Sequence, residues 1–175
     1  MRMRVLLTVL MVTVVTAMMR AQDFASRYMS ENAGDTTLVC ISVSPRMMEE
    51  ILEKGIQEKD TIGITEIISK LKSMQIVYAE KRGKGYFEKA EEMAERNSAR
   101  FRKLASYDKE KDHCRIFVRE QEEQIVELVL LKQEGRRFTV INFTGNMDRG
   151  FIEELKHTMI LKPMKGEESW EFYLL

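Results

Sequence analysis

Cysteine, histidine, proline and glycine are all scarce in this sequence. Its 175 residues include two Cys, two His, two Pro and nine Gly. Two cysteines fall far below the density of a small disulfide-stapled domain, and so few Pro and Gly leave little room for a disordered linker. Neither His113 nor His157 has a second His or a Cys at ligand spacing, which argues against a metal site. We therefore expect one ordinary globular domain without a metal or cofactor.

Both cysteines lie within apolar, strand-like runs. Cys40 falls in the run 36–43 and Cys114 in the run 114–119. Cysteines in such runs usually pack as small hydrophobic side chains, so we expect two buried thiols and no disulfide. Export of the protein would nevertheless permit a bridge between them. Cys114 is not expected to act as a nucleophile, because His113 is the only base near it in the sequence.

Residues 1–21 have the pattern of a secretory signal peptide. A basic start is followed by an uncharged run over residues 5–19, and polarity returns at Arg20. This run of about 15 residues is shorter than the roughly 20 that a spanning helix needs. We predict cleavage after Ala21, which leaves residues 22–175 as a single domain in the periplasm or cell envelope. The alternative is an uncleaved N-terminal anchor.

Removal of this leader would change the charge balance. The full chain has 28 Lys and Arg and 28 Asp and Glu residues, and the leader contains three arginines and no acidic residue. The remaining chain would carry a net charge near −3. A nucleic-acid-binding protein normally has a basic face. We therefore expect no nucleic-acid partner, and membrane contact only through the leader if it is not cleaved.

Apolar spacing divides the rest of the chain into strands and helices. The order β-α-α-β-α-β-β-β-α predicts an α+β domain, with a mixed sheet of about five strands and helices packed mainly on one face. The last three strands form an antiparallel meander over residues 114–144. The expected strands are 36–43, 75–80, 114–119, 125–131 and 138–143. The expected helices are 44–55, 64–71, 86–105 and one from residue 151, with a short helix over 23–31 before them.

Local signals refine these elements. The first strand has apolar residues on both faces and is therefore predicted to be interior. Ser44, followed by Pro45, predicts a helix start, and Asn146 or Asp148 is expected to cap the last helix. Residues 82–86 resemble the start of a phosphate loop, but the further glycines or the Lys-Ser/Thr pair of that motif are missing. We interpret them as a flexible turn before a helix N-terminus that could hold an anion weakly.

Glu127 is the one charged residue in an otherwise apolar strand. A buried carboxylate there needs a partner. We expect either an edge position or pairing with Arg115, Arg119 or Arg137 on a neighbouring strand. A catalytic acid would require a second carboxylate or a cleft partner that the sequence does not supply. The glycosylation pattern that begins at Asn142 lies within a predicted strand, so we regard it as accidental.

The C-terminal tail contains the only Trp of the chain. Trp170, Phe172 and Leu174 alternate with other residues, as in a strand. The simpler interpretation is an edge strand added to the protein's own sheet. The functional alternative is a partner-binding segment in which Trp170, Phe172 and Tyr173 contact another protein.

Five blocks of mostly packing residues carry a family resemblance: 24–28 (FASRY), 43–47 (VSPRM), 67–77 (ending MQIV), 125–131 (IVELVLL) and 140–148 (VINFTGNMD). With them, the mature chain resembles an exported family, typical of Bacteroidota, catalogued as domain of unknown function 4252. The resemblance implies a small envelope protein with no assigned activity or cofactor. Relatives near extracytoplasmic-function sigma-factor and anti-sigma systems imply a signalling or stress role. Many relatives carry a lipid-attachment Cys at the signal end, which this chain lacks.

Three functional hypotheses follow. The first is a non-enzymatic, exported module that binds another envelope protein or takes part in signalling. The second is a small envelope hydrolase or transferase whose site assembles from separated residues such as Glu127, His113 and Arg115. The third is a structural assembly protein that uses an exposed sheet edge. The oligomeric state is left open.

Overall fold

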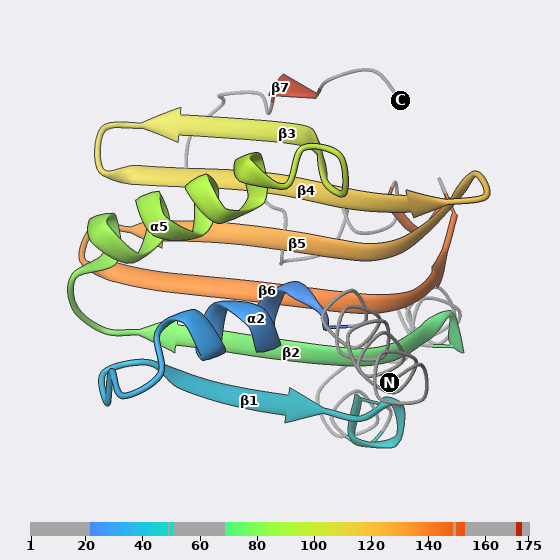
Figure 1. Cartoon of the computed structure of the whole chain (residues 1–175), viewed down its shortest axis with the longest axis horizontal. Coiled ribbons are helices and arrows are strands. Elements are labelled where there is room, and N and C mark those ends of the chain that lie inside the picture. The colour runs from blue at the N-terminus through green and yellow to red at the C-terminus, as the bar shows by residue number, and fades with distance from the viewer. Residues whose placement is uncertain (1–21, 49, 51–68, 149, 153–170, 173–175) are drawn as a thin grey trace, which may run out of the picture.

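Two helices cross one face of an antiparallel sheet in the computed structural model, which describes residues 22–48, 50, 69–148, 150–152 and 171–172 (Figure 1). The described strands are β1 (Val39–Val43), β2 (Leu71–Ala79), β3 (Arg102–Lys109), β4 (Asp112–Gln121), β5 (Gln124–Glu134), β6 (Arg137–Met147) and β7 (Glu171–Phe172). The helices with described bounds are α2 (Phe24–Glu31) and α5 (Gly83–Arg96). The strands lie in the order β1-β2-β6-β5-β4-β3-β7.

The predicted α+β class and the C-terminal meander are confirmed. Strands β3 to β6 follow one another in space as they do in sequence, and β2 returns beside β6. The sheet differs from the expectation in two ways. It has more than the expected five strands, and every described pairing is antiparallel rather than mixed. The first two strands are antiparallel neighbours, so their connection is not a crossover between parallel strands.

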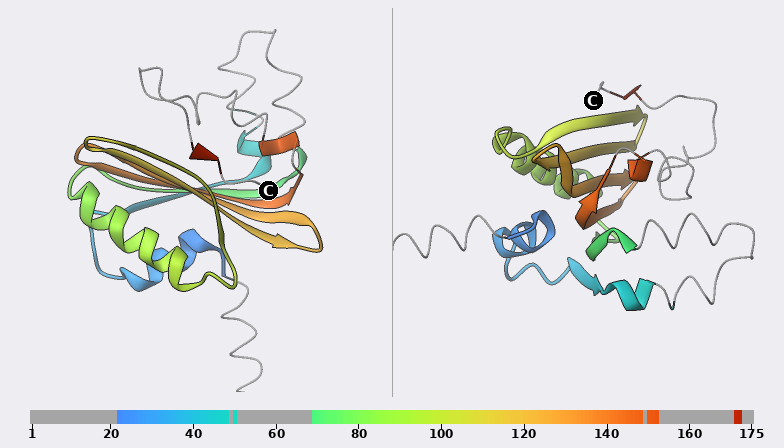
Figure 2. Two further views of the ribbon diagram at one scale, coloured as in Figure 1. Left: turned by 90° about the horizontal axis from the view of Figure 1, so that it is seen from above. Right: turned by 90° about the vertical axis from the view of Figure 1, so that its right-hand side faces the viewer.

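Helices α2 and α5 pack on one face, as expected, whereas the helical residues 45–48 and 150–152 lie against the other face. Figure 2 shows α2 and α5 together on the same side of the sheet. They bury aromatic side chains, among them Tyr28, Tyr86 and Phe87, against a sheet surface that includes Val129 and Phe138. The other face of the sheet is also apolar and buried. Its residues include Leu128, Leu130 and Phe143, which cluster with Met48, Phe151 and Ile152.

The long helix predicted over 86–105 is the main error in element boundaries. Helix α5 ends at Arg96, and Asn97 caps it by donating from Nδ2 to the carbonyl oxygen of Met93 at 2.8 Å. The chain then enters β3 at Arg102, and Phe101, just before the strand, packs on the opposite face of the sheet from Leu104. Their spacing of three residues suits one face of a helix, which is why the sequence pattern misassigned them.

The first strand is an edge strand, not an interior one. Strand β1 pairs with β2 alone among the described strands, so most of its side chains are exposed. This exposure includes Cys40, which we expected to be buried, whereas Cys114 is buried as predicted. Both thiols are free in the structure. Apolar residues on both faces of a strand therefore did not indicate interior position here.

Several predicted helix boundaries can be compared with the structure. Residues 45–48 are helical, and the Ser44 Oγ accepts from the Met47 amide at 3.3 Å, as expected for a cap. Asp148, rather than Asn146, caps the last helix by accepting from the Phe151 amide at 2.9 Å. The expected helix 64–71 lies mostly outside the described residues, and β2 already begins at its last position. The predicted leader, 1–21, is also outside them.

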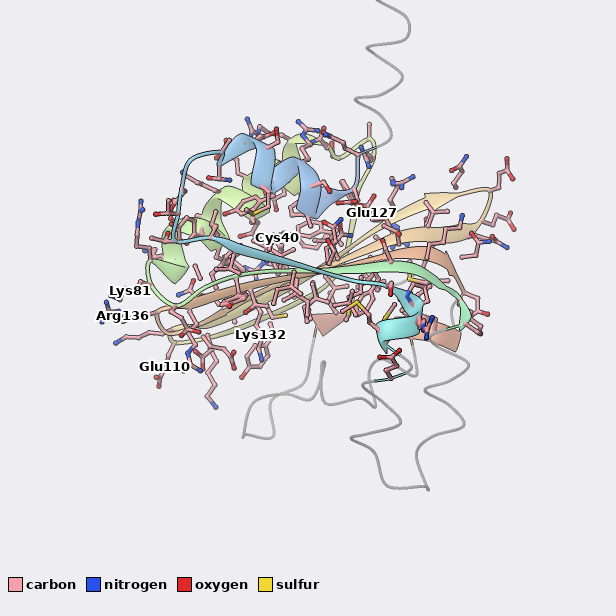
Figure 3. All side chains as sticks on the ribbon, turned by 90° about the horizontal axis from the view of Figure 1, so that it is seen from below. Cys40, Lys81, Glu110, Glu127, Lys132 and Arg136 are labelled. Atoms are coloured by element: carbon pink, nitrogen blue, oxygen red, sulfur yellow. The ribbon has the colours of Figure 1, made fainter. Side chains whose placement is uncertain are left out.

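The glycine-rich turn before α5 is a close packing contact. Gly83 begins the helix and donates its amide to the Arg136 carbonyl at 2.8 Å, which joins α5 to the β5–β6 hairpin. A Cβ at Gly83 would overlap the carbonyl oxygen of Arg137 and lie 2.7 Å from that of Arg136. Arg136 and Lys81 accordingly lie at the same end of the sheet (Figure 3). The turn is thus fixed rather than flexible.

Two glycines two residues apart provide a matched test of this contact. We expect Gly83→Ala to destabilise the protein by about 1–3 kcal/mol, because the added methyl must displace backbone of the hairpin. Gly85 also lies in α5 but would place its Cβ in open space. Gly85→Ala should therefore stabilise by about 0.5–1 kcal/mol through helix propensity. Urea unfolding of both variants measures the difference, and shifts of equal sign would contradict the packing role of Gly83.

Candidate functional site

Glu127 is completely buried near the start of β5, and its carboxylate accepts four hydrogen bonds. Its Oε1 accepts from the Phe24 backbone amide at 2.6 Å and from Asn142 Nδ2 at 3.3 Å. Its Oε2 accepts from Arg119 Nε at 2.8 Å and from Arg100 Nη2 at 3.2 Å. Charge-assisted bonds of this kind are the stronger class of hydrogen bond. The burial of Glu127 is therefore balanced by two cations and two neutral donors.

This arrangement confirms one prediction and adds two side-chain partners that the sequence did not reveal. Arg119 was one of three arginines expected to pair with Glu127 across neighbouring strands. Arg100 was not considered, because it fell within the predicted long helix. Asn142 was noted only as an accidental glycosylation pattern, and its burial, with 1% of its surface exposed, supports that interpretation.

The buried polar residues cap helix α2 from the sheet. The first amides of a helix have no partner within the helix. Glu127 accepts from the amide of Phe24, and Asn142 Oδ1 accepts from the amide of Ala25 at 2.9 Å. Asp23, the N-cap residue, accepts from Ser26 at 2.8 Å. The helix start therefore lies directly over Glu127, as Figure 3 shows, where a negative charge also suits the helix dipole.

The sheet is irregular around this point. Register shifts occur between Arg119 and Glu120 in β4, between Ile125 and Glu127 in β5, and between Leu71 and Ser73 in β2. Bulges bend strands and re-aim side chains, and they are common next to functional sites. The three shifts affect the pairings β2–β6, β6–β5 and β5–β4, which join four adjacent strands. They therefore distort the same end of the sheet.

A shallow pocket of about 310 Å³ opens beside the distorted strands. It is lined by Asp23, Lys72, Arg119, Gln121, Val126, Thr144 and Gly145. Arg119 connects the pocket to the buried centre, because its Nε is bonded to Glu127. The Asp23 carboxylate is already occupied by the Ser26 amide and by Gln75 Nε2 at 3.2 Å. Among the described residues, Lys72 forms no ion pair, so the pocket has excess positive charge.

His113 and Arg115 belong to a separate polar cluster on β4. His113 Nδ1 lies 2.6 Å from Asp108 Oδ1, and Arg115 Nη1 donates to the same oxygen at 2.9 Å. Burial raises the pKa of Asp108, but the hydrogen bonds from Arg115 and His113 outweigh it and hold the pKa below its usual value. Arg115 also donates to Glu91 Oε1 at 2.6 Å. These groups form an ion-pair network with α5.

The residues of the enzyme hypothesis are therefore not brought together. Glu127 lies opposite Arg119 in the sheet, whereas Arg115 lies opposite Leu131, four positions further along β5. Burial also raises the pKa of the Cys114 thiol to about 12, which leaves it protonated and a poor nucleophile. Among the described residues, no group of three or more His, Cys, Asp or Glu side chains is placed to hold a metal ion.

The tail is described only at Glu171 and Phe172. These two residues form β7, which pairs antiparallel with β3 so that Phe172 lies opposite Ala105. The expected addition of an edge strand is thus seen for this pair. Trp170 and Tyr173 lie outside the described residues, and the role of Trp170, Phe172 and Tyr173 in partner binding stays a prediction.

The fold and its polar centre define a small α+β domain in which a buried carboxylate fixes a helix to an antiparallel sheet. The model of the family described as Domain of unknown function (DUF4252) matches residues 28–155, and the chain belongs to this family. The resemblance drawn from the sequence is thereby confirmed at the level of the family. Comparisons with curated proteins and with solved structures found no match. No helix in the described part of the chain is long and apolar enough to cross a membrane.

Removal of the Glu127 charge tests whether it holds the domain together. We expect Glu127→Gln to cost about 3–5 kcal/mol of unfolding free energy, because Arg100 and Arg119 would lose their common partner within the protein. Glu80 provides a control, since its ion pair with Arg137 at 3.1 Å is exposed on both sides. Glu80→Gln should cost less than about 1 kcal/mol.

Equilibrium unfolding in urea measures both changes. Hydrogen exchange adds a local readout, because the amides of Phe24 and Ala25 should lose protection in Glu127→Gln before the centre of β5 does. A Glu127→Gln protein as stable as Glu80→Gln would show that the carboxylate does not anchor α2.

Proposed function

We propose that this protein is an exported, non-enzymatic binding module of the cell envelope, associated with signalling of the extracytoplasmic sigma-factor kind. The leader pattern of residues 1–21 supports export, and the resemblance to exported relatives supports the envelope and the signalling role. Contacts that residues 22 and 23 make with the domain support a mature chain that begins at Gln22. The Gln22 carbonyl accepts from Arg100 Nη2 at 2.5 Å, and Asp23 already caps α2.

One observation carries the choice of binding over catalysis. The carboxylates near the pocket accept hydrogen bonds from within the protein, whereas its cationic side chains have donor groups without a described partner. Glu127 accepts four hydrogen bonds, and both oxygens of Asp23 have partners. A general base needs a lone pair that faces the substrate. Arg119 uses its Nε for Glu127, and the described residues provide no partner for its terminal nitrogens.

The charge and shape of the pocket favour an anionic group. An arginine fork matches the two oxygens of a carboxylate, and a lysine adds a point charge. Arg119 and Lys72 together line the open pocket. We therefore propose that the module binds an acidic side chain or a C-terminal carboxylate of an envelope protein. The aromatic tail provides a second predicted contact, through Trp170, Phe172 and Tyr173.

The competing hypothesis of a small hydrolase or transferase has less support. It required Glu127, His113 and Arg115 to converge, and the structure places the first at the start of α2 and the other two in the network with Asp108. The pocket does contain polar groups, but none of the residues proposed for catalysis lines it.

Export is tested first. Expression of the full chain in a bacterium with two membranes, followed by cell fractionation, should recover the protein from the envelope fraction. Its N-terminal sequence should begin at Gln22, because cleavage after Ala21 leaves a chain whose first turn is already capped. Recovery from the cytoplasmic fraction with Met1 retained would contradict the proposal. Recovery from the envelope fraction with Met1 retained would indicate the uncleaved anchor.

The binding surface is tested by a pair of charge reversals. Lys72→Glu places a negative charge in the pocket and should reduce crosslinking to envelope proteins by about tenfold, because it repels the acidic group. Lys81→Glu makes the same change at the far end of the sheet from Glu127 (Figure 3) and should leave crosslinking unchanged. Both lysines are exposed, so both variants should keep the unfolding midpoint of the native protein.

Crosslinking in intact cells, followed by recovery of the protein, provides the measurement. Equal crosslinking by the two variants would exclude the pocket as the contact. In that case, deletion of residues 169–175 would show whether the tail carries the contact instead.

A further inference from the structure

Strand β1 is an open edge of the sheet. It pairs with β2 on one side, and no other described strand lies on its other side (Figure 1). Val39 and Ile41 point to the same face of the sheet and are 41% and 44% exposed. Cys40 and Ser42, on the opposite face, are exposed as well. An edge of this kind presents unpaired backbone groups beside exposed apolar side chains.

This edge lacks the usual protection against pairing. Natural edge strands commonly carry charges, proline or a bulge that prevents another strand from adding to them. Residues 36–44 include no charged residue and no proline. The register between β1 and β2 runs from Val39 to Val43 without a shift, so no bulge twists the strand away. The β1 edge therefore lacks the features that prevent another strand from pairing with it.

The opposite side of the sheet shows the contrast. Strand β3 carries charged residues at both of its ends, including Arg102, Lys103, Asp108 and Lys109. Its outer side is also paired with β7 at two positions. Self-pairing of β3 would bring several charges together, whereas self-pairing of β1 brings none. The difference in charge between the two edges points to β1 as the one that accepts a strand.

We propose that two copies of this protein associate through antiparallel pairing of their β1 strands, centred on Cys40. A second copy fits the edge because both strands are uncharged, so no charge is buried and none is repelled. In this register Val39 of each copy lies opposite Ile41 of the other, and the two Cys40 residues lie opposite each other. The exposed apolar residues then cover one another on one face, and the two sheets become continuous.

The two-fold arrangement is geometrically consistent. Directly opposite residues of an antiparallel pair lie on the same face of the sheet. The register centred on Cys40 pairs residues 39 and 41, which already share a face, so α2 of both copies lies on the same side of the joined sheet. Such an interface is isologous and closes at two copies. Because a five-residue strand pair is a small interface, the association should depend on concentration.

Sedimentation velocity of the protein recovered from the envelope tests this proposal. The native protein should shift from monomer to dimer as its concentration rises. Ile41→Lys should weaken the dimer by about tenfold or more, because it places a charge on the paired edge. Gln124→Lys is the matched control, since Gln124 is also an exposed strand residue but lies at the start of β5. It should leave the dissociation constant unchanged.

Oxidation provides a second measurement. It can be made on the native protein and does not depend on whether a variant with a changed edge strand folds. Opposite residues of an antiparallel pair are close enough for a disulfide. Treatment with diamide should link two copies through Cys40, as the two thiols give two electrons and two protons to the diamide. Cys40→Ser should abolish the link and Cys114→Ser should retain it.

The outcomes that overturn the proposal are distinct. A native protein that stays monomeric at the highest attainable concentration, with no diamide-linked dimer, excludes self-pairing. Equal dissociation constants for Ile41→Lys and Gln124→Lys would place any dimer elsewhere. Loss of a different captured envelope protein in Ile41→Lys, with a monomeric native protein, would assign the edge to a foreign strand instead.

Discussion

The hydrogen bonds of the Glu127 carboxylate are the interaction on which the rest of the structure depends. The carboxylate is buried in the sheet, and it accepts hydrogen bonds from a helix amide, an asparagine side chain and two arginines. Each donor comes from a different part of the chain, so one residue fixes α2, the chain after α5, β4 and β6 around β5. A buried charge is tolerated only with such complete satisfaction. The aromatic packing of α2 on the sheet follows from the position that these bonds impose.

The same centre supports the proposal that the neighbouring pocket binds a ligand rather than catalyses a reaction. Arg119 is held by Glu127 through one nitrogen and lines the pocket with the rest of its side chain. A cation held in place loses less conformational freedom when a ligand arrives. The strand irregularities at Arg119 and Ile125 lie in the sheet beside it. The structural role of Glu127 and the proposed ligand contact therefore share one arginine.

Much of the fold could be predicted from short-range pattern. The apolar runs 125–131 and 138–143 identified the central hairpin, and the lone charge in the first run predicted pairing with one of three arginines, of which Arg119 is the partner. Strand β3 was missed because Phe101 and Leu104 are three residues apart, which suits a helix as well as two sheet faces. The edge position of β1 was missed because alternation shows which residues are apolar, not how many neighbouring strands are present.

The candidate site was less predictable than the fold. The pairing of Ala25 with Asn142 spans 117 residues, and no local spacing encodes such a contact. Arg100 was hidden for a related reason, because its role becomes visible only when the chain leaves the helix at Asn97. The polar centre forms only when distant parts of the chain come together in the folded sheet. The hairpin beneath it can be predicted from the local pattern of apolar residues.

The cap of α2 also sets an order of events. Its partners Glu127 and Asn142 follow the helix by 103 and 117 residues. Helix α2 is thus completed by strands that are synthesised long after it, and contacts of such long range form slowly. Until β5 and β6 pair, the N-terminal segment has no place to dock. Under the proposed export, this delay keeps the segment next to the leader unfolded while the chain still has to cross a membrane.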